Sequence, residues 1–167
     1  MPPPDRRTIV VCIGNELVAD DAAGFEVYRR LAAEASAGVC GAAGAGARLE
    51  YCGVGGIDLL PLLEGETDLI VVDAVQLGAR PGTVHVLPWD RLPQGGAQVS
   101  AHGLGLKETI EIGRILYPGR LPERITLVGI EGCCFNLTRQ YMTWEVAQAI
   151  EVAAARVREL LQEGVHG

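Results

Sequence analysis

Five short apolar segments along the chain have the pattern of β-strands. They cover residues 8–13, 48–54, 68–75, 82–87 and 125–130. The third, DLIVVDAV, has the longest β-branched run, which is typical of a central strand buried on both faces. Only QLGARP separates it from the fourth, and this is too short for the crossover that a parallel return needs. We therefore expect the fourth strand to run antiparallel to the third.

Helix-like spacing of apolar residues fills most of the intervals between these segments. Helices are expected over residues 21–35, 57–63 and 104–117, and over the final segment after Thr143. The last is the clearest, because Thr143 is a typical N-cap residue and one apolar stripe follows it. That stripe consists of Val146, Ile150, Ala153, Val157 and Leu160. Strands that alternate with helices predict a three-layer α/β/α fold on a mixed, mostly parallel five-stranded sheet with one antiparallel strand.

The composition supports a single domain over residues 1–167 with an aliphatic interior. Apolar residues make up 49% of the chain and aromatic residues only 5%. A net charge of −7 argues against a nucleic-acid partner, because phosphate binding needs clustered Lys and Arg. No stretch approaches the roughly 20 apolar residues of a membrane span, and MPPPDRR lacks the apolar core of a signal peptide. We expect a soluble cytoplasmic protein with no membrane partner, and a monomer.

The cysteines give little sign of a metal or redox site. They are Cys12, Cys40, Cys52, Cys133 and Cys134, an odd number, and no C-x-x-C occurs. We interpret them as buried, reduced thiols. For the adjacent Cys133 and Cys134 the alternative is a reactive thiol, but no neighbour in the sequence lowers the pKa of either one.

Polar residues interrupt the apolar pattern at three places where strands end or helices begin. Asp20 and Asp21 follow the first strand, Asp73 lies near the end of the central strand, and His102 precedes a helix. An N-cap role explains one acid of the first pair, but it does not explain the other. A charge at Asp73 costs several kcal/mol unless it is paired, hydrogen-bonded or metal-bound. Open α/β sheets bind ligands at this carboxyl edge, so these side chains are candidates for one site.

The chemistry of this set allows several interpretations. Two carboxylates and an imidazole suit a borderline metal such as nickel or zinc, and without metal two carboxylates can act as an acid/base pair. In the structural alternatives, Asp73 only accepts backbone N–H groups and His102 is a surface histidine. His85 and His166 are interpreted as incidental. A nucleotide loop is disfavoured because GNELVADDAAG carries three acids, and no G-x-S-x-G motif occurs.

Four motifs occur along the chain in the order GNELVADDAAG, VVDAVQLGARPGTV, SAHGLGLKETI and ITLVGIEG. Together they resemble those of the hydrogenase maturation proteases, which trim the C-terminal extension from the large subunit of [NiFe] hydrogenases. The resemblance implies a phosphorylase/hydrolase-like fold and places a metal-binding cleft on Asp21, Asp73 and His102. Asp20 matches the first acid of the family's pair, for which we keep the N-cap interpretation. Cys12 and Ala22 depart from glycines that the family often has, and the usual Gly-rich lead into the last helix is absent.

The resemblance also implies a mechanism, in which the protease acts on a hydrogenase large-subunit precursor after nickel insertion. Asp21, Asp73 and His102 are then expected to ligate the substrate's nickel, or a surrogate divalent metal, and to align the scissile peptide bond. They are therefore both the expected catalytic and the expected metal-binding residues of an aspartic-type, nickel-recognising endopeptidase. Two alternatives remain open: another metal- or carboxylate-dependent peptidase on the same fold, and a non-enzymatic nickel-sensing scaffold for maturation.

Overall fold

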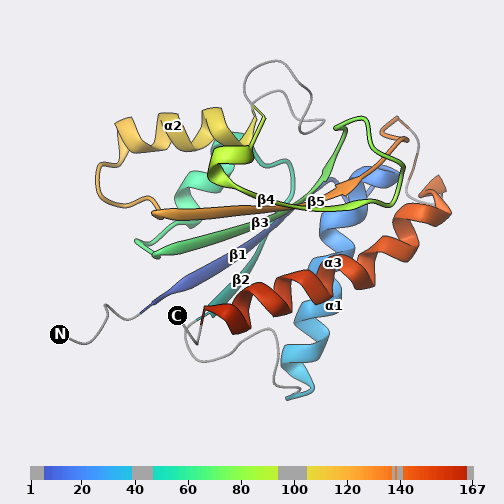
Figure 1. Ribbon diagram of the computed structural model, residues 1–167, viewed down its shortest axis with the longest axis horizontal. Helices are drawn as coiled ribbons and strands as arrows, with labels where there is room; N and C mark the ends of the chain where they lie inside the picture. Colours follow the sequence, from blue (N-terminus) through green and yellow to red (C-terminus); the bar gives the residue numbers. More distant parts are fainter. Residues whose placement is uncertain (1–5, 39–46, 94–104, 137, 139–140, 165–167) are drawn as a thin grey trace.

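A computed structural model describes residues 6–38, 47–93, 105–136, 138 and 141–164. Five strands form one sheet in the order β2-β1-β3-β5-β4 (Figure 1). Their bounds are Thr8–Ile13 (β1), Ala47–Cys52 (β2), Asp68–Val75 (β3), Val84–Pro88 (β4) and Arg124–Glu131 (β5). Every predicted strand is therefore present, with ends that differ by a few residues.

Four strands are parallel, and β4 alone runs the other way. β1 pairs in parallel with β2 and β3, and β3 pairs in parallel with β5. β4 pairs antiparallel with β5 at the edge of the sheet, so its predicted direction relative to β3 is confirmed, although β5 lies between the two. The carboxyl ends of β1, β2, β3 and β5 consequently meet at one edge, where the candidate site lies.

Helices cover both faces of the sheet, which confirms the predicted three layers. α1 (Ala23–Ser36) and α3 (Trp144–Glu163) pack on one face, and α2 (Leu106–Leu116) packs on the other (Figure 1). Short 3-10 turns complete the chain at η1 (Asp20–Ala22), η2 (Gly56–Leu62) and η3 (Trp89–Arg91). The predicted helix around Pro61 is thus a 3-10 segment. None of the helices in the described part of the chain is both long and apolar enough to cross a membrane.

The alternation along β3 decides which way its acid points. Val72 packs in the core beneath α1 and α3, whereas Val71 and Val75 pack in the core beneath α2. Successive side chains of a strand point to opposite faces, so Asp73 points to the α2 face. The central strand therefore carries its carboxyl group on the face that α2 covers.

Candidate active site

Two glycines set the close approach of the turn that carries Asp21. Gly14, directly after β1, has a φ of 151°, and a Cβ there would collide with the carbonyl oxygen of Asp21. A Cβ on Gly24, in the first turn of α1, would collide with the carbonyl oxygen of Ile13 and lie 3.1 Å from that of Val72. The start of α1 therefore rests directly on the ends of β1 and β3, and a side chain at either glycine would push the acid away.

Asp21 is held beneath the chain that follows β1. Its side chain is almost fully buried, with 2% of the residue exposed. The carboxylate accepts a hydrogen bond from the backbone N–H of Asn15 at 3.0 Å, and the Asn15 side chain in turn accepts one from the N–H of Leu17 at 3.0 Å. The turn therefore fixes the orientation of this carboxylate through its own backbone.

Asp73 is the most perturbed acid of the site. The residue is 6% exposed, and within the described residues its Oδ1 atom is buried without a hydrogen-bond partner. Burial raises the pKa of Asp73 well above its ordinary value, and the nearby negative charge of Asp21 raises it further. A hydrogen bond from the Ala74 backbone lowers this pKa, but by less. The structure thus brings Asp21 and Asp73 together as an electrostatically coupled pair at the ends of two adjacent strands.

His102, the third predicted site residue, lies outside the described residues, so its part in the site stays a prediction. Within the described ranges no group of three or more His, Cys, Asp or Glu side chains is placed to hold a metal ion. Cys12, on the neighbouring strand β1, does not supply a nucleophile, because burial and then the charge of Asp73 raise the pKa of its thiol. The described part of the site is therefore a carboxyl pair.

The interpretation of Asp20 as the cap of the first helix is wrong. A 3-10 turn precedes α1, and neither the turn nor α1 has a side-chain hydrogen bond at its N-cap. The Asp20 carboxylate instead accepts hydrogen bonds from the N–H groups of Cys133 and Cys134, both at 2.9 Å, and from the N–H of Thr143 at 2.8 Å. Asp20 therefore joins the turn after β1 to the segment between β5 and α3.

Thr143 is the N-cap residue of α3, as predicted, but its side chain makes a different bond. The hydroxyl donates to the Asp20 carboxylate at 3.0 Å and does not cap the helix. Among the cysteines, Cys12 and Cys52 are buried as predicted, whereas Cys133 is exposed, so the buried interpretation is wrong there. Cys40 lies outside the described residues.

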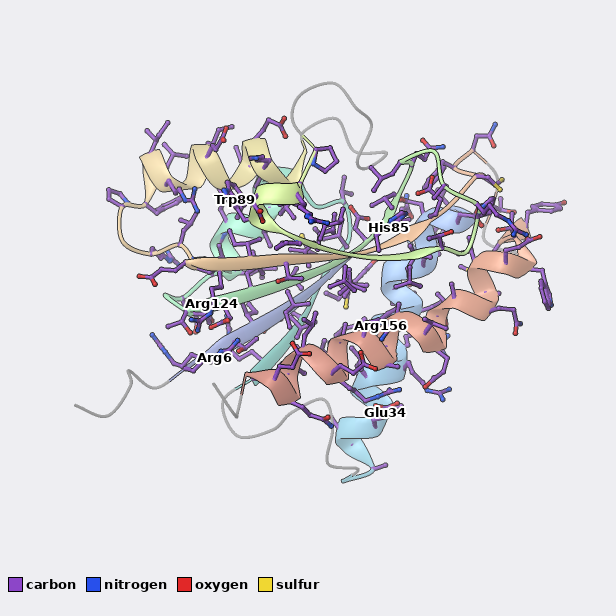
Figure 2. The ribbon with its side chains drawn as sticks, in the orientation of Figure 1. Arg6, Glu34, His85, Trp89, Arg124 and Arg156 are labelled. Atoms are coloured by element: carbon purple, nitrogen blue, oxygen red, sulfur yellow. The ribbon has the colours of Figure 1, made fainter. Side chains whose placement is uncertain are left out.

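Glu131, at the end of β5, is a buried acid at the carboxyl edge that the sequence did not single out. Its carboxylate accepts hydrogen bonds from the N–H groups of Leu77 and Gly78, and it contacts His85 Nε2 at 3.0 Å. His85 therefore has a buried ionisable partner, which its position near the edge of the sheet did not indicate. In Figure 2, His85 lies far from Arg6 and Arg124, which mark the opposite, amino-terminal end of the strands.

Comparison with known proteins identifies the family. The model of the hydrogenase maturation proteases, the HycI family, matches residues 51–160 of the chain. The hydrogenase expression/formation protein HupD of Rhodobacter capsulatus is 34% identical over 162 residues, which cover 95% of this chain and 73% of HupD. The chain belongs to the hydrogenase maturation proteases. HupD of Rhizobium leguminosarum bv. viciae is 33% identical, over 78% of this chain but only 61% of its own length.

Solved structures of hydrogenase maturation proteases share the fold. The hydrogenase maturating endopeptidase HybD from E. coli superposes with a TM-score of 0.74 at 25% identity, covering 94% of this chain and 93% of HybD. The [NiFe] hydrogenase maturation protease HybD from Thermococcus kodakarensis has a TM-score of 0.71 at 21% identity, covering 92% and 98%. The mixed five-stranded sheet with helices on both faces is thus the architecture of this protease family.

Proposed function

We propose that this chain is the endopeptidase that removes the C-terminal extension of a [NiFe] hydrogenase large-subunit precursor once nickel has been inserted. Membership of the hydrogenase maturation proteases supports the class of reaction. The observation that supports the site is the coupling of two buried carboxyl groups, Asp21 and Asp73, at the carboxyl edge of the sheet. A pair of buried acids in mutual repulsion is costly to the fold, which favours a role in chemistry.

In this proposal the nickel belongs to the substrate. Asp73 Oδ1 is a buried acceptor without a partner in the described residues, and a cation beside it would also relieve the repulsion between Asp73 and Asp21. Carboxylate oxygens together with an imidazole are a suitable donor set for nickel, so the residues fit, with His102 as the third ligand. A divalent cation near the scissile carbonyl polarises it. The protein's own part is to hold Asp21 rigidly and to exclude water around Asp73.

A second candidate mechanism uses the carboxyl pair alone, and the raised pKa of Asp73 favours it. A protonated Asp73 beside a charged Asp21 is an acid/base pair. Asp21 takes a proton from a water molecule that attacks the scissile carbonyl, and Asp73 gives its proton to the leaving amide nitrogen. The peptide bond breaks and one water is consumed. In this version nickel serves only to position the substrate.

Incubation with a large-subunit precursor, prepared with and without nickel, tests the proposal. We expect the wild type to shorten only the nickel-containing precursor, as seen by mass spectrometry, and Asp73→Ala to abolish shortening. Asp90→Asn, an exposed acid in η3, is the matched control and should cleave at the wild-type rate. Cleavage of both precursors would indicate the other peptidase class, and binding without cleavage would indicate a scaffold. Wild-type rates in Asp73→Ala would refute the proposed site.

Asp73→Asn distinguishes the two mechanisms. In the metal-contacting version the wild-type rate rises with pH as Asp73 loses its proton. In the acid/base version the rate falls as the pH rises through the raised pKa of Asp73. In Asp73→Asn, the side-chain amide of the new asparagine is too weak an acid to donate a proton, but its oxygen still ligates a metal weakly. A variant that retains measurable nickel-dependent cleavage with a flattened pH profile therefore favours the metal-contacting version.

A further inference from the structure

Five large apolar side chains stand exposed at the carboxyl edge of the sheet. They are Leu17, Val54, Ile57, Tyr141 and Trp144, with 71%, 58%, 53%, 55% and 72% of their surface exposed, and we call them the apolar rim. They come from three segments that follow β1, β2 and β5. Single exposed apolar residues are ordinary, but several on loops that meet at one edge mark an interaction surface.

Backbone contacts link the three segments that carry the apolar rim. The N–H of Gly14 donates to the carbonyl of Gly53 at 3.1 Å, which links the segments after β1 and β2. Val18 forms an isolated antiparallel bridge with Thr138, and the N–H of Asp20 donates to the carbonyl of Cys134 at 2.9 Å. The segment after β1 therefore lies between the other two and contacts both.

The apolar rim is tied to the carboxyl pair. The backbone N–H of Asn15 donates to the Asp21 carboxylate, and the Asn15 side chain accepts a hydrogen bond from the N–H of Leu17. Leu17 is therefore linked to Asp21 through Asn15. On the other side, Asp20 holds Thr143, whose neighbour is Trp144. Figure 1 shows the start of α1 beside the segment that leads into α3. A partner bound to the apolar rim would consequently lie next to Asp21.

The exposed charges at positions 14–18, 53–58 and 141–145 are all negative. Glu16, Asp58 and Glu145 are exposed on the same three segments. In the described parts of residues 14–18, 53–58 and 141–145 there is no Lys or Arg. A surface that combines exposed apolar groups with exposed carboxylates is complementary to a partner that presents apolar side chains beside Lys or Arg.

We propose that the apolar rim is the docking surface for the protein substrate, and that it takes a segment of the large-subunit precursor in which apolar residues are flanked by Lys or Arg. This inference rests on the proposed function, because it names the chemistry of that function's substrate. Trp144 and Leu17 provide the anchoring contacts, and the three carboxylates steer the basic residues toward the acid pair.

The double variant Leu17→Ser, Trp144→Ser tests the docking surface. We expect KM for the nickel-containing precursor to rise about tenfold or more while kcat stays within about twofold, because truncation of buried interface anchors weakens binding. Ile115→Ser is the matched control, since Ile115 is 79% exposed at the far end of α2, and its KM should not change. An unchanged KM in the double variant would overturn the inference. No cleavage by the wild type would instead overturn the proposed function.

Charge reversal tests the chemistry of the partner. For Glu16→Lys, Asp58→Lys we expect a lower kcat/KM at low salt, and the salt dependence of the wild type should disappear, because screening acts on exposed charges. The double variant Asp90→Lys, Glu111→Lys, at two exposed acids on η3 and α2, is the control that changes the net charge by the same amount. The same loss in both variants would contradict a local steering role.

A second copy of the chain is the competing occupant of the apolar rim. A wild-type dimer in sedimentation that Trp144→Ser converts to a monomer would overturn substrate docking.

Discussion

Removal of the Asp20 carboxylate should destabilise the protein far more than the loss of an ordinary helix cap. Its oxygens accept three backbone N–H groups and the Thr143 hydroxyl, at 2.8 to 3.2 Å, from a residue with 0% exposure. A buried donor left without an acceptor costs about 1–3 kcal/mol. The N–H of exposed Cys133 regains water, so the two remaining backbone donors set the expected loss in Asp20→Ala at about 2–6 kcal/mol. Loss of an N-cap typically costs about 1 kcal/mol.

Urea unfolding at neutral pH, followed by far-UV circular dichroism, measures this difference. Asp20→Asn keeps one acceptor oxygen and should lose about half as much as Asp20→Ala, because hydrogen bonds to a charged acceptor are the stronger ones. Asp90→Asn, which is exposed, should stay within about 0.5 kcal/mol of the wild type. If Asp20→Ala loses no more than about 1 kcal/mol with an unchanged m-value, the argument that Asp20 joins the two segments is refuted.

Two further predictions concern the pH dependence of stability. Burial and then the charge of Asp21 raise the pKa of Asp73 above its ordinary 3.8, so the folded state keeps a proton that the unfolded chain releases. Above pH 4 the free energy of unfolding of Asp73→Asn should therefore exceed that of the wild type, and the difference should grow with pH up to the raised pKa. A difference that stays constant between pH 4 and 8 would contradict this prediction. Asp68 should behave in the opposite way: burial alone would raise its pKa, but hydrogen bonds from Arg124, Arg6 and Thr67 hold the pKa well below 3.8. Asp68→Asn should lower the free energy of unfolding at pH 7 by about 1–3 kcal/mol, after a discount for the partly exposed arginines. This loss should disappear as the pH falls below 4 and the wild-type carboxylate gains its proton. A loss that stays the same in acid would contradict this prediction.

The layers of the fold were predictable because local periodicity decides them. The β-branched run of β3 identified the central strand, and the short link to β4 fixed the direction of that strand. The closeness of Asp21 and Asp73 was also predictable, since Asp21 follows β1, Asp73 lies near the carboxyl end of the neighbouring parallel strand β3, and such ends share one edge. Helix starts were less accurate, because η1 moves the start of α1 to Ala23.

The bonds of Asp20 and Glu131 could not be predicted in the same way. The partners of Asp20 are 113, 114 and 123 residues away, and Glu131 contacts His85 across 46 residues and Leu77 across 54. No periodicity within a segment reports a contact over such distances. Several of these partners are backbone N–H groups, so no residue type in the sequence marks them. An acid beside a helix start is locally indistinguishable from a cap.

Those backbone donors have a consequence for how sequences of this family can diverge. Asp20, Asp21 and Glu131 hold the loops of the carboxyl edge chiefly through N–H groups, at Cys133, Cys134, Thr143, Asn15, Leu77 and Gly78. Every amino acid except proline supplies such a donor. The identity of most loop residues is thus decoupled from the geometry that they maintain. Surface side chains around the acid pair are free to follow a changing partner, while three interior carboxylates keep the frame in place.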